Sequence, residues 1–137
     1  MSRAGQLAAH ALVLGLGLGA PSGAPAQTVG AAWQTTPASM LKSSLRAVVA
    51  AQDKYRASHS GFASTLEALQ VEPGADVKIQ ILGASPAGWR AKATHRTRPG
   101  RSCVVFVGAL NGAELPRTDG DGEMAGEERV PLCDRME

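Results

Sequence analysis

Residues 40–69 read MLKSSLRAVVAAQDKYRASHSGFASTLEAL, and the first two thirds of this stretch have the spacing of one amphipathic helix. Four apolar or aromatic side chains and one glutamine recur four, three, four and three residues apart, which keeps them on one stripe of a helix. The members of the stripe are Leu41, Leu45, Val48, Gln52 and Tyr55. Nothing later in the chain has a comparable helical period, so we expect the rest of the domain to pack against this stripe.

The sequence also predicts where this helix begins and ends. Thr36 or Ser39 can cap the first turn, and Pro37 stands where a first-turn proline is tolerated. At the other end, the residues HSG at 59–61 predict a stop, because Gly61 can adopt the left-handed C-cap conformation at little steric cost.

A short apolar tail follows the stop. We expect it to fold back beside Tyr55 and to form a second, short helix, with Ser64 or Thr65 near its cap and Glu67 in its first turn. The apolar residues of this tail are Phe62, Leu66 and Leu69.

After the tail, the chain changes to the two-residue period of strands. Residues 77–82 alternate in the way of a half-buried strand, and residues 89–96 alternate apolar positions with mostly basic ones. Residues 103–107 (CVVFV) form a continuous apolar run, which indicates the most buried strand. The connections are expected at residues 71–74 (VEPG), 83–88 (GASPAG) and 98–100 (RPG).

The remaining chain is rich in glycine and reads as a long loop over residues 108–130. Residues 130–133 (VPLC) end the domain as an edge strand or a pinned coil, because Pro131 cannot donate a hydrogen bond to a neighbouring strand. Together these elements predict an α+β domain, in which one long helix lies across a three- or four-stranded antiparallel sheet.

The first residues have the features of a cleavable signal peptide. Arg3 is followed by a short apolar run at residues 11–20, and the small residues of Ala24-Pro25-Ala26 suit signal peptidase. The run is about half the roughly 20 residues that a membrane-spanning helix needs. The alternative is an uncleaved N-terminal anchor.

Cleavage after Ala26 would give residues 1–26 as the signal, 27–38 as a flexible lead-in and 39–137 as the folded domain. We therefore expect an exported protein, periplasmic or extracellular, with no integral membrane span in its mature form.

The chain has two cysteines, Cys103 and Cys133. In an exported protein a disulfide between them can persist, and the alternative is two unrelated buried thiols. A disulfide would leave no thiol as a nucleophile. The sequence also has no glycine-flanked serine elbow and no histidines at metal-ligand spacing, so we expect no catalytic residues and no enzyme activity.

The formal net charge is +2, or +1 once Arg3 is removed with the signal, and this balance identifies no partner. The basic residues are nevertheless concentrated in one stretch, residues 90–101, which we call the basic segment. A polyanion such as an anionic polysaccharide would suit it, whereas nucleic acid also needs stacking aromatics, and Trp89 is expected on the opposite face of the strand. The candidate polyanion contacts are Arg90, Lys92, Arg96, Arg98 and Arg101.

A second concentration of charge is the acidic loop, residues 119–123 (DGDGE). The carboxylates of Asp119, Asp121 and Glu123 are hard oxygen ligands of the kind that Ca²⁺ prefers, although the loop does not fit the EF-hand pattern. The alternative is a solvated, flexible loop that binds no ion. A third use is mutual, since the basic segment could bind the acidic loop of another molecule or of the same one.

Several segments, in their order, resemble the globular half of type IV pilins and type II secretion pseudopilins. Residues 40–46 (MLKSSLR) and 51–55 (AQDKY) resemble the region just after the pilin membrane helix. Residues 61–69 (GFASTLEAL) resemble the fold-back of the family, and residues 88–95 (GWRAKATH) resemble a core strand. Cys103 with Cys133 resembles the C-terminal disulfide of many members.

The resemblance extends from Met40 to about Asp134. It implies a structural, adhesion or accessory role by surface contact, with protein partners in a pilus or secretion system. Some pseudopilins bind calcium in a loop near the C-terminus, and DNA-uptake pilins have cationic patches. The prepilin leader, the glutamate after its cleavage site and the long apolar helix of pilins have no counterpart here, so we expect a soluble exported head domain and not a filament subunit.

Overall fold

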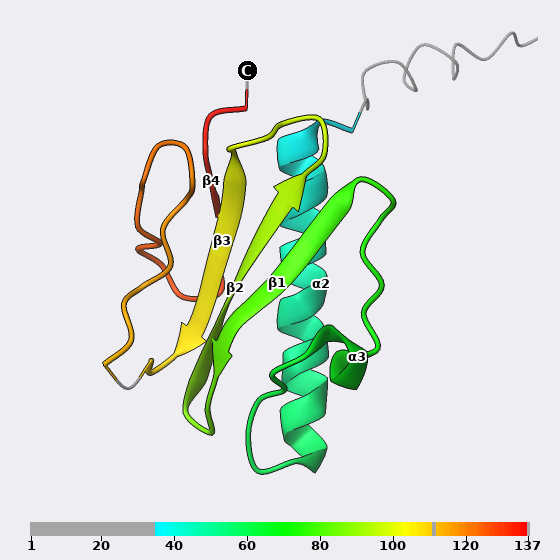
Figure 1. Ribbon diagram of the computed structural model, residues 1–137. Coiled ribbons are helices and arrows are strands. Elements are labelled where there is room, and N and C mark those ends of the chain that lie inside the picture. Colours follow the sequence, from blue (N-terminus) through cyan, green and yellow to red (C-terminus); the bar gives the residue numbers. More distant parts are fainter. Residues whose placement is uncertain (1–34, 111, 137) are drawn as a thin grey trace, which may run out of the picture. The chain divides into compact units, whose positions relative to one another are not determined.

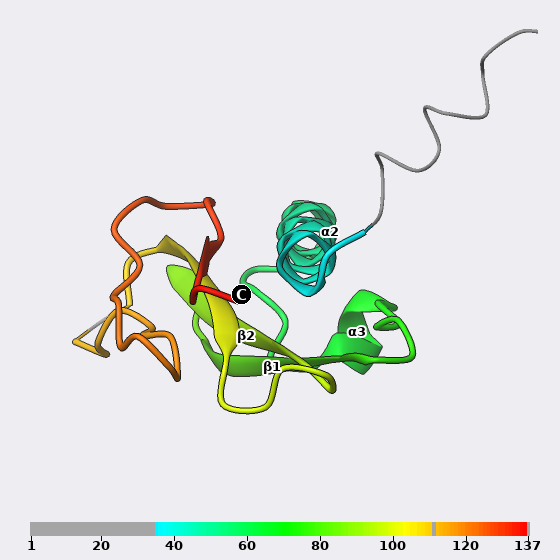
Figure 2. The same ribbon diagram turned by 90° about the horizontal axis from the view of Figure 1, so that it is seen from above.

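The computed structural model describes residues 35–110 and 112–136. Its elements in chain order are α2 (Pro37–Ser58), α3 (Leu66–Leu69), β1 (Val77–Ala84), β2 (Gly88–His95), β3 (Ser102–Gly108) and β4 (Leu132–Cys133). The strands form one antiparallel sheet in the order β1-β2-β3-β4, and α2 lies across one face of it (Figures 1 and 2). The predicted α+β architecture is thus confirmed, whereas the predicted signal peptide lies outside the described residues.

The start of α2 is set by Thr36 and Pro37. The side-chain oxygen of Thr36 accepts a hydrogen bond from the backbone N–H of Ser39 at 3.2 Å, so Thr36 is the N-cap and Ser39 lies inside the first turn. Pro37 is the first helical residue, where its missing N–H costs nothing. The helix therefore includes the last two residues of the predicted lead-in, 27–38.

The predicted role of Gly61 at the end of α2 is wrong. The C-cap is His59, which is extended, and Gly61 does not adopt a left-handed conformation. His59 closes the last turn itself, because its Nδ1 lies 2.8 Å from the carbonyl oxygen of Tyr55 and donates to it. Gly61 instead allows a close approach, since a Cβ at this position would lie 3.1 Å from Cα of Pro86.

The predicted helical stripe is confirmed as the centre of the core. Leu41, Leu45 and Val48 are fully buried, and Tyr55 is half-buried. The polar member, Gln52, is also fully buried, and its amide makes two 2.8 Å hydrogen bonds with the backbone N–H and C=O of Ala63. This pair of bonds holds the fold-back segment against α2.

The fold-back ends in α3, as expected from its sequence. Thr65 is the N-cap, with its hydroxyl oxygen accepting from the N–H of Ala68, and Leu69 is buried in the core. A left-handed residue, Gln70, ends this helix. The turn before the sheet closes later than the predicted residues 71–74, because the N–H of Val77 bonds to the carbonyl of Gly74.

The sheet has the predicted alternation, but β1 ends later and β2 begins earlier than predicted. On β2, Trp89, Ala91, Ala93 and His95 are buried, and β1 continues through Ala84, so the predicted loop at residues 83–88 shortens to three residues between the strands. β3 is the most buried strand and lies between β2 and the two-residue β4.

The expectation that everything packs against the α2 stripe is only partly correct. Val104 is fully buried yet lies outside the main core cluster, which contains its neighbours Cys103 and Val105. Because side chains alternate along a strand, Val104 faces the side of the sheet opposite α2. The chain after β3 provides cover on that side, as the contacts below show.

In the described part of the chain, no helix combines the length and the apolar character needed to cross a membrane.

Candidate functional site

The two charged segments singled out in the sequence bind each other within one molecule. Lys92 forms an ion pair with Asp119, and Nη1 of Arg101 lies 2.7 Å from Oδ1 of Asp121. The N–H of Asp119 also donates to the hydroxyl oxygen of Ser102 at 2.8 Å. The acidic loop therefore lies over the outer face of β2 and β3, and the mutual use predicted for these segments occurs intramolecularly.

The other basic residues have different partners. Nη1 of Arg90 donates to the carbonyl oxygen of Glu114 at 3.0 Å. Nε of Arg96 lies 2.8 Å from Oδ1 of Asp76 in an exposed ion pair. Arg98 donates to two backbone carbonyl oxygens, of Met136 at 3.1 Å and of Thr97 at 3.0 Å. The basic segment is thus divided between carboxylate partners and carbonyl partners.

Asp134 is the residue that the sequence interpretation missed. It is 3 % exposed, and its carboxylate accepts hydrogen bonds from the backbone N–H groups of Ser102 (2.8 Å), Gly120 (2.9 Å) and Asp121 (2.6 Å). The side chain of Thr118 bonds to the same carboxylate. Asp134 therefore joins the β3 edge to the acidic loop. Its only signal in the sequence is its position next to Cys133.

The hydrogen bonds around Asp134 determine its ionisation. Burial alone would raise the pKa of this carboxyl, but the bonds from Thr118, Asp121, Gly120 and Ser102 outweigh burial and lower the pKa to about 2. The pKa of Asp121 is also lowered, first by the backbone N–H of Arg135 and then by the guanidinium of Arg101. Both carboxylates remain ionised at neutral pH.

The disulfide lies next to this carboxylate cluster. Cys103 and Cys133 are bonded and face each other across β3 and β4. Next to the disulfide, Ser102 and Asp134 continue the pairing of the two strands, because the N–H of Asp134 donates to the carbonyl oxygen of Ser102 at 2.9 Å. The disulfide and Asp134 thus fix the same point of the C-terminal segment, which Figure 1 shows beside β3.

Two further contacts hold this C-terminal segment along the rest of β3. The N–H of Gly108 donates to Oε1 of Glu128 at 2.6 Å, and the N–H of Arg129 donates to the carbonyl of Phe106 at 2.9 Å. Arg129 has a left-handed backbone (φ 71°) and forms an ion pair with Asp53 on α2. A non-glycine residue in this conformation is held there by its surroundings. The segment therefore links the sheet edge to the helix.

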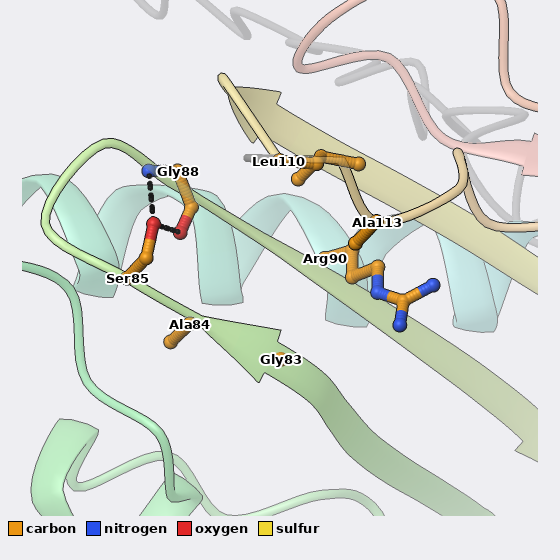
Figure 3. A pocket seen from close by; sticks show the side chains of 7 residues that line it. All are labelled: Gly83, Ala84, Ser85, Gly88, Arg90, Leu110 and Ala113. Carbon is orange, nitrogen blue, oxygen red and sulfur yellow. Dashed lines mark hydrogen bonds between the residues drawn. The ribbon is translucent and has the colours of Figure 1, made fainter.

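A small hollow of about 170 Å³ lies between the β1–β2 connection and the loop after β3 (Figure 3). Ser85 and Gly88 are hydrogen-bonded to each other at one end of it, and Arg90 lies at the other. Arg90 is the one charged residue in its lining and already bonds to the carbonyl of Glu114. The hollow thus offers little beyond one guanidinium to a ligand.

Two of the three predicted calcium ligands form ion pairs in this structure. Asp119 and Asp121 bond to Lys92 and Arg101, while Glu123 is exposed and bonds through its backbone to Thr118. Within residues 35–110 and 112–136, no three acidic, histidine or cysteine side chains are grouped closely enough to hold a metal ion. Calcium would have to displace both cations.

This competition leads to a testable prediction. We expect millimolar calcium to change the melting temperature of the wild-type protein by less than about 1 °C, because a ligand whose concentration is far below its Kd hardly stabilises the protein that it binds. The variant Lys92→Gln/Arg101→Gln removes the cation partner of each aspartate and should show the larger calcium-dependent rise. A wild-type rise equal to that of the variant would mean that the ion pairs do not compete with calcium.

Comparison with protein-family models and with curated proteins identifies no relative. No protein-family model matches the chain, and a search of curated proteins gives no match. The fold and site therefore define the class of this protein only as an α+β domain with a disulfide-braced C-terminal segment. The resemblance to pilins stays a prediction.

Proposed function

We propose that this chain is an exported, non-enzymatic pilin-like protein that acts by surface contact with a protein partner of a pilus or secretion system, as an adhesion or accessory component. One observation carries the proposal. A long helix, its fold-back, an antiparallel sheet and a C-terminal disulfide follow one another in the order that the pilin resemblance implies.

Export is supported by the disulfide. A bond between Cys103 and Cys133 persists in an oxidising compartment and is rare in the cytosol. The signal-like features of residues 1–26 agree with such a destination. The mature protein is then periplasmic or extracellular.

The assignment as a non-enzyme is supported by the bonds that its polar side chains make. The carboxylates of Asp119, Asp121 and Asp134 hold the acidic loop in place. Nδ1 of His59 bonds to the end of α2. The three carboxylates and His59 act in structural hydrogen bonds, which is consistent with a protein that works through its surface. Nδ1 of His95 accepts from the N–H of Thr97, whereas its buried Nε2 has no partner among the described residues.

Site-specific photocrosslinking in the cells that produce the protein tests the proposal. A photoreactive residue is introduced at Ala47, exposed on α2, or at Gln80, exposed on β1, and the crosslinked proteins are identified by mass spectrometry. We expect at least one position to give a light-dependent adduct with a pilus or secretion component. Adducts with unrelated proteins only, or uncrosslinked chain at both positions, would contradict the proposal.

A second candidate function is binding of a polyanion by the basic segment. It is favoured by the position of Arg98, whose guanidinium donates to backbone carbonyl oxygens and pairs with no carboxylate among the described residues. Binding of this kind weakens with rising salt, as counterions are released. Retention on immobilised heparin should therefore fall steeply with salt, and salt-independent retention would exclude this candidate.

A further inference from the structure

A larger hollow, of about 420 Å³, lies where β1 begins and β2 ends. Its walls come from residues 75–78, 94–96 and 98–100. Lys78 is the cross-strand partner of Thr94, and Asp76 and Arg96 extend the same ladder through a 2.9 Å backbone bond. Lys78, Thr94 and Arg96 alternate with buried residues, so they share the face of the sheet opposite α2.

The charge in this hollow is unbalanced. Among the described residues that line it, three are cations, Lys78, Arg96 and Arg98, and one, Asp76, is a carboxylate. The ion pair of Arg96 uses its Nε, which leaves both terminal nitrogens of the guanidinium as donors. Lys78 is exposed and forms no ion pair with any described residue. Three positive charges and one negative charge leave a local excess of two.

Arg98 makes more side-chain hydrogen bonds than the other two cations. Its Nε and Nη1 donate to the carbonyl oxygens of Met136 and Thr97, which fixes the plane of the guanidinium without neutralising its charge. A guanidinium held in this way loses little further freedom when an anion binds, and its fork matches two oxygens of one ligand.

The remaining basic residues of the segment are in a different situation. Lys92 and Arg101 are paired with the acidic loop, so an external anion would have to displace Asp119 or Asp121 to reach them. The fold thus divides the five cations that the sequence presents as one set. Lys92 and Arg101 are neutralised by the acidic loop, Arg90 bonds to the carbonyl of Glu114, and Arg96 and Arg98 lie at the hollow, where Asp76 is the one carboxylate in the described lining. Lys78, which lies elsewhere in the sequence, joins Arg96 and Arg98.

We propose that this hollow, which we call the hairpin-end site, binds one tetrahedral oxyanion, the phosphate or sulfate ester group of a larger ligand. Arg96 and Arg98 would each offer N–H donors, Lys78 would supply a point charge, and the hydroxyl of Thr94 lies in the same lining. The inference rests on the second candidate function and names both its ligand group and its site.

Titration of the full-length exported protein with sodium phosphate or sodium sulfate, followed by amide and arginine Nε–H NMR signals, tests this site. Sodium chloride at equal ionic strength is the reference. We expect saturable shifts at Lys78, Arg96 and Arg98, and stronger binding of one anion assigns the ester class. Shifts that grow linearly with salt for all three anions would overturn the proposal.

Matched variants make the test specific. Lys78→Gln should weaken anion binding by about fivefold, the upper range for one exposed charge pair. Lys54→Gln removes another exposed lysine, which lies on α2 outside the hollow, and should leave the affinity unchanged. An equal effect of the two substitutions would refute the site.

Failure of the hairpin-end site can be distinguished from failure of the two proposed functions. If Lys78→Gln has no effect but heparin retention stays salt-dependent, the polyanion candidate stands and the hairpin-end site is wrong. If no anion binds while the photocrosslinks form, the contact function stands without it.

Discussion

Asp134→Asn should destabilise the protein by about 3 kcal/mol and lower its melting temperature by roughly 15 °C. Both carboxylate oxygens of Asp134 accept backbone N–H groups, so an amide in either orientation would place its NH₂ against a backbone N–H donor. The carboxylate that is lost also accepts from Thr118. Thermal and urea unfolding of the variant measure the effect.

Asp119→Asn is the matched control, because this carboxylate belongs to the same loop but pairs with Lys92 at the surface. Its loss should cost less than about 1 kcal/mol. Equal destabilisation by the two substitutions would show that Asp134 has no special role in holding the loop.

The pH dependence of stability gives a second readout of the same group. The pKa of Asp134 is lowered from 3.8 to about 2 in the folded protein, so its ionised form stabilises the fold fully above pH 3.8, and this contribution is lost as the pH falls toward 2. The shift corresponds to about 2 kcal/mol. The stability difference between wild type and Asp134→Asn should therefore narrow by about that amount on acidification, and a constant difference would exclude this titration.

Reduction of the Cys103–Cys133 disulfide should cost about 3 to 4 kcal/mol and lower the melting temperature by roughly 15 to 20 °C. The bond closes a loop with a sequence separation of 30, which restricts the unfolded chain. It also anchors a strand of two residues, β4, whose few ladder bonds are a weak restraint by themselves. Melting with and without reductant measures the effect.

A variant that lacks both cysteines distinguishes the effect of losing the disulfide from any other effect of the reductant. Cys103→Ala/Cys133→Ala should melt at nearly the temperature of the reduced wild-type protein and should not respond to reductant. A melting temperature unchanged from that of the oxidised protein would contradict the structural role of the bond.

The helix and the strands were predictable because their periods are local properties of the sequence. Leu41, Leu45 and Val48 mark the buried side of α2, and the alternation from Trp89 to His95 marks the buried side of β2. The end of α2 was less predictable, since a histidine hydrogen bond to Tyr55 replaced the expected left-handed glycine at 61.

The site was predictable only as two charged segments. Their composition marked residues 90–101 and 119–123, but which cation meets which carboxylate depends on how the long loop crosses the sheet. The role of Asp134 could not be predicted from the sequence, because its partners Ser102 and Gly120 lie 32 and 14 residues away in the chain. Lys78 joins the hairpin-end site only through its register opposite Thr94.

Export of the chain and oxidation of its two cysteines underlie the proposed function. The intact mass of the protein recovered from separate membrane and soluble fractions tests both at once. We expect a soluble species that begins at Gln27 and lacks two hydrogens, the result of signal cleavage and of the Cys103–Cys133 bond. A membrane-bound species that retains the N-terminal segment, or a reduced species confined to the cytosol, would contradict the proposed function.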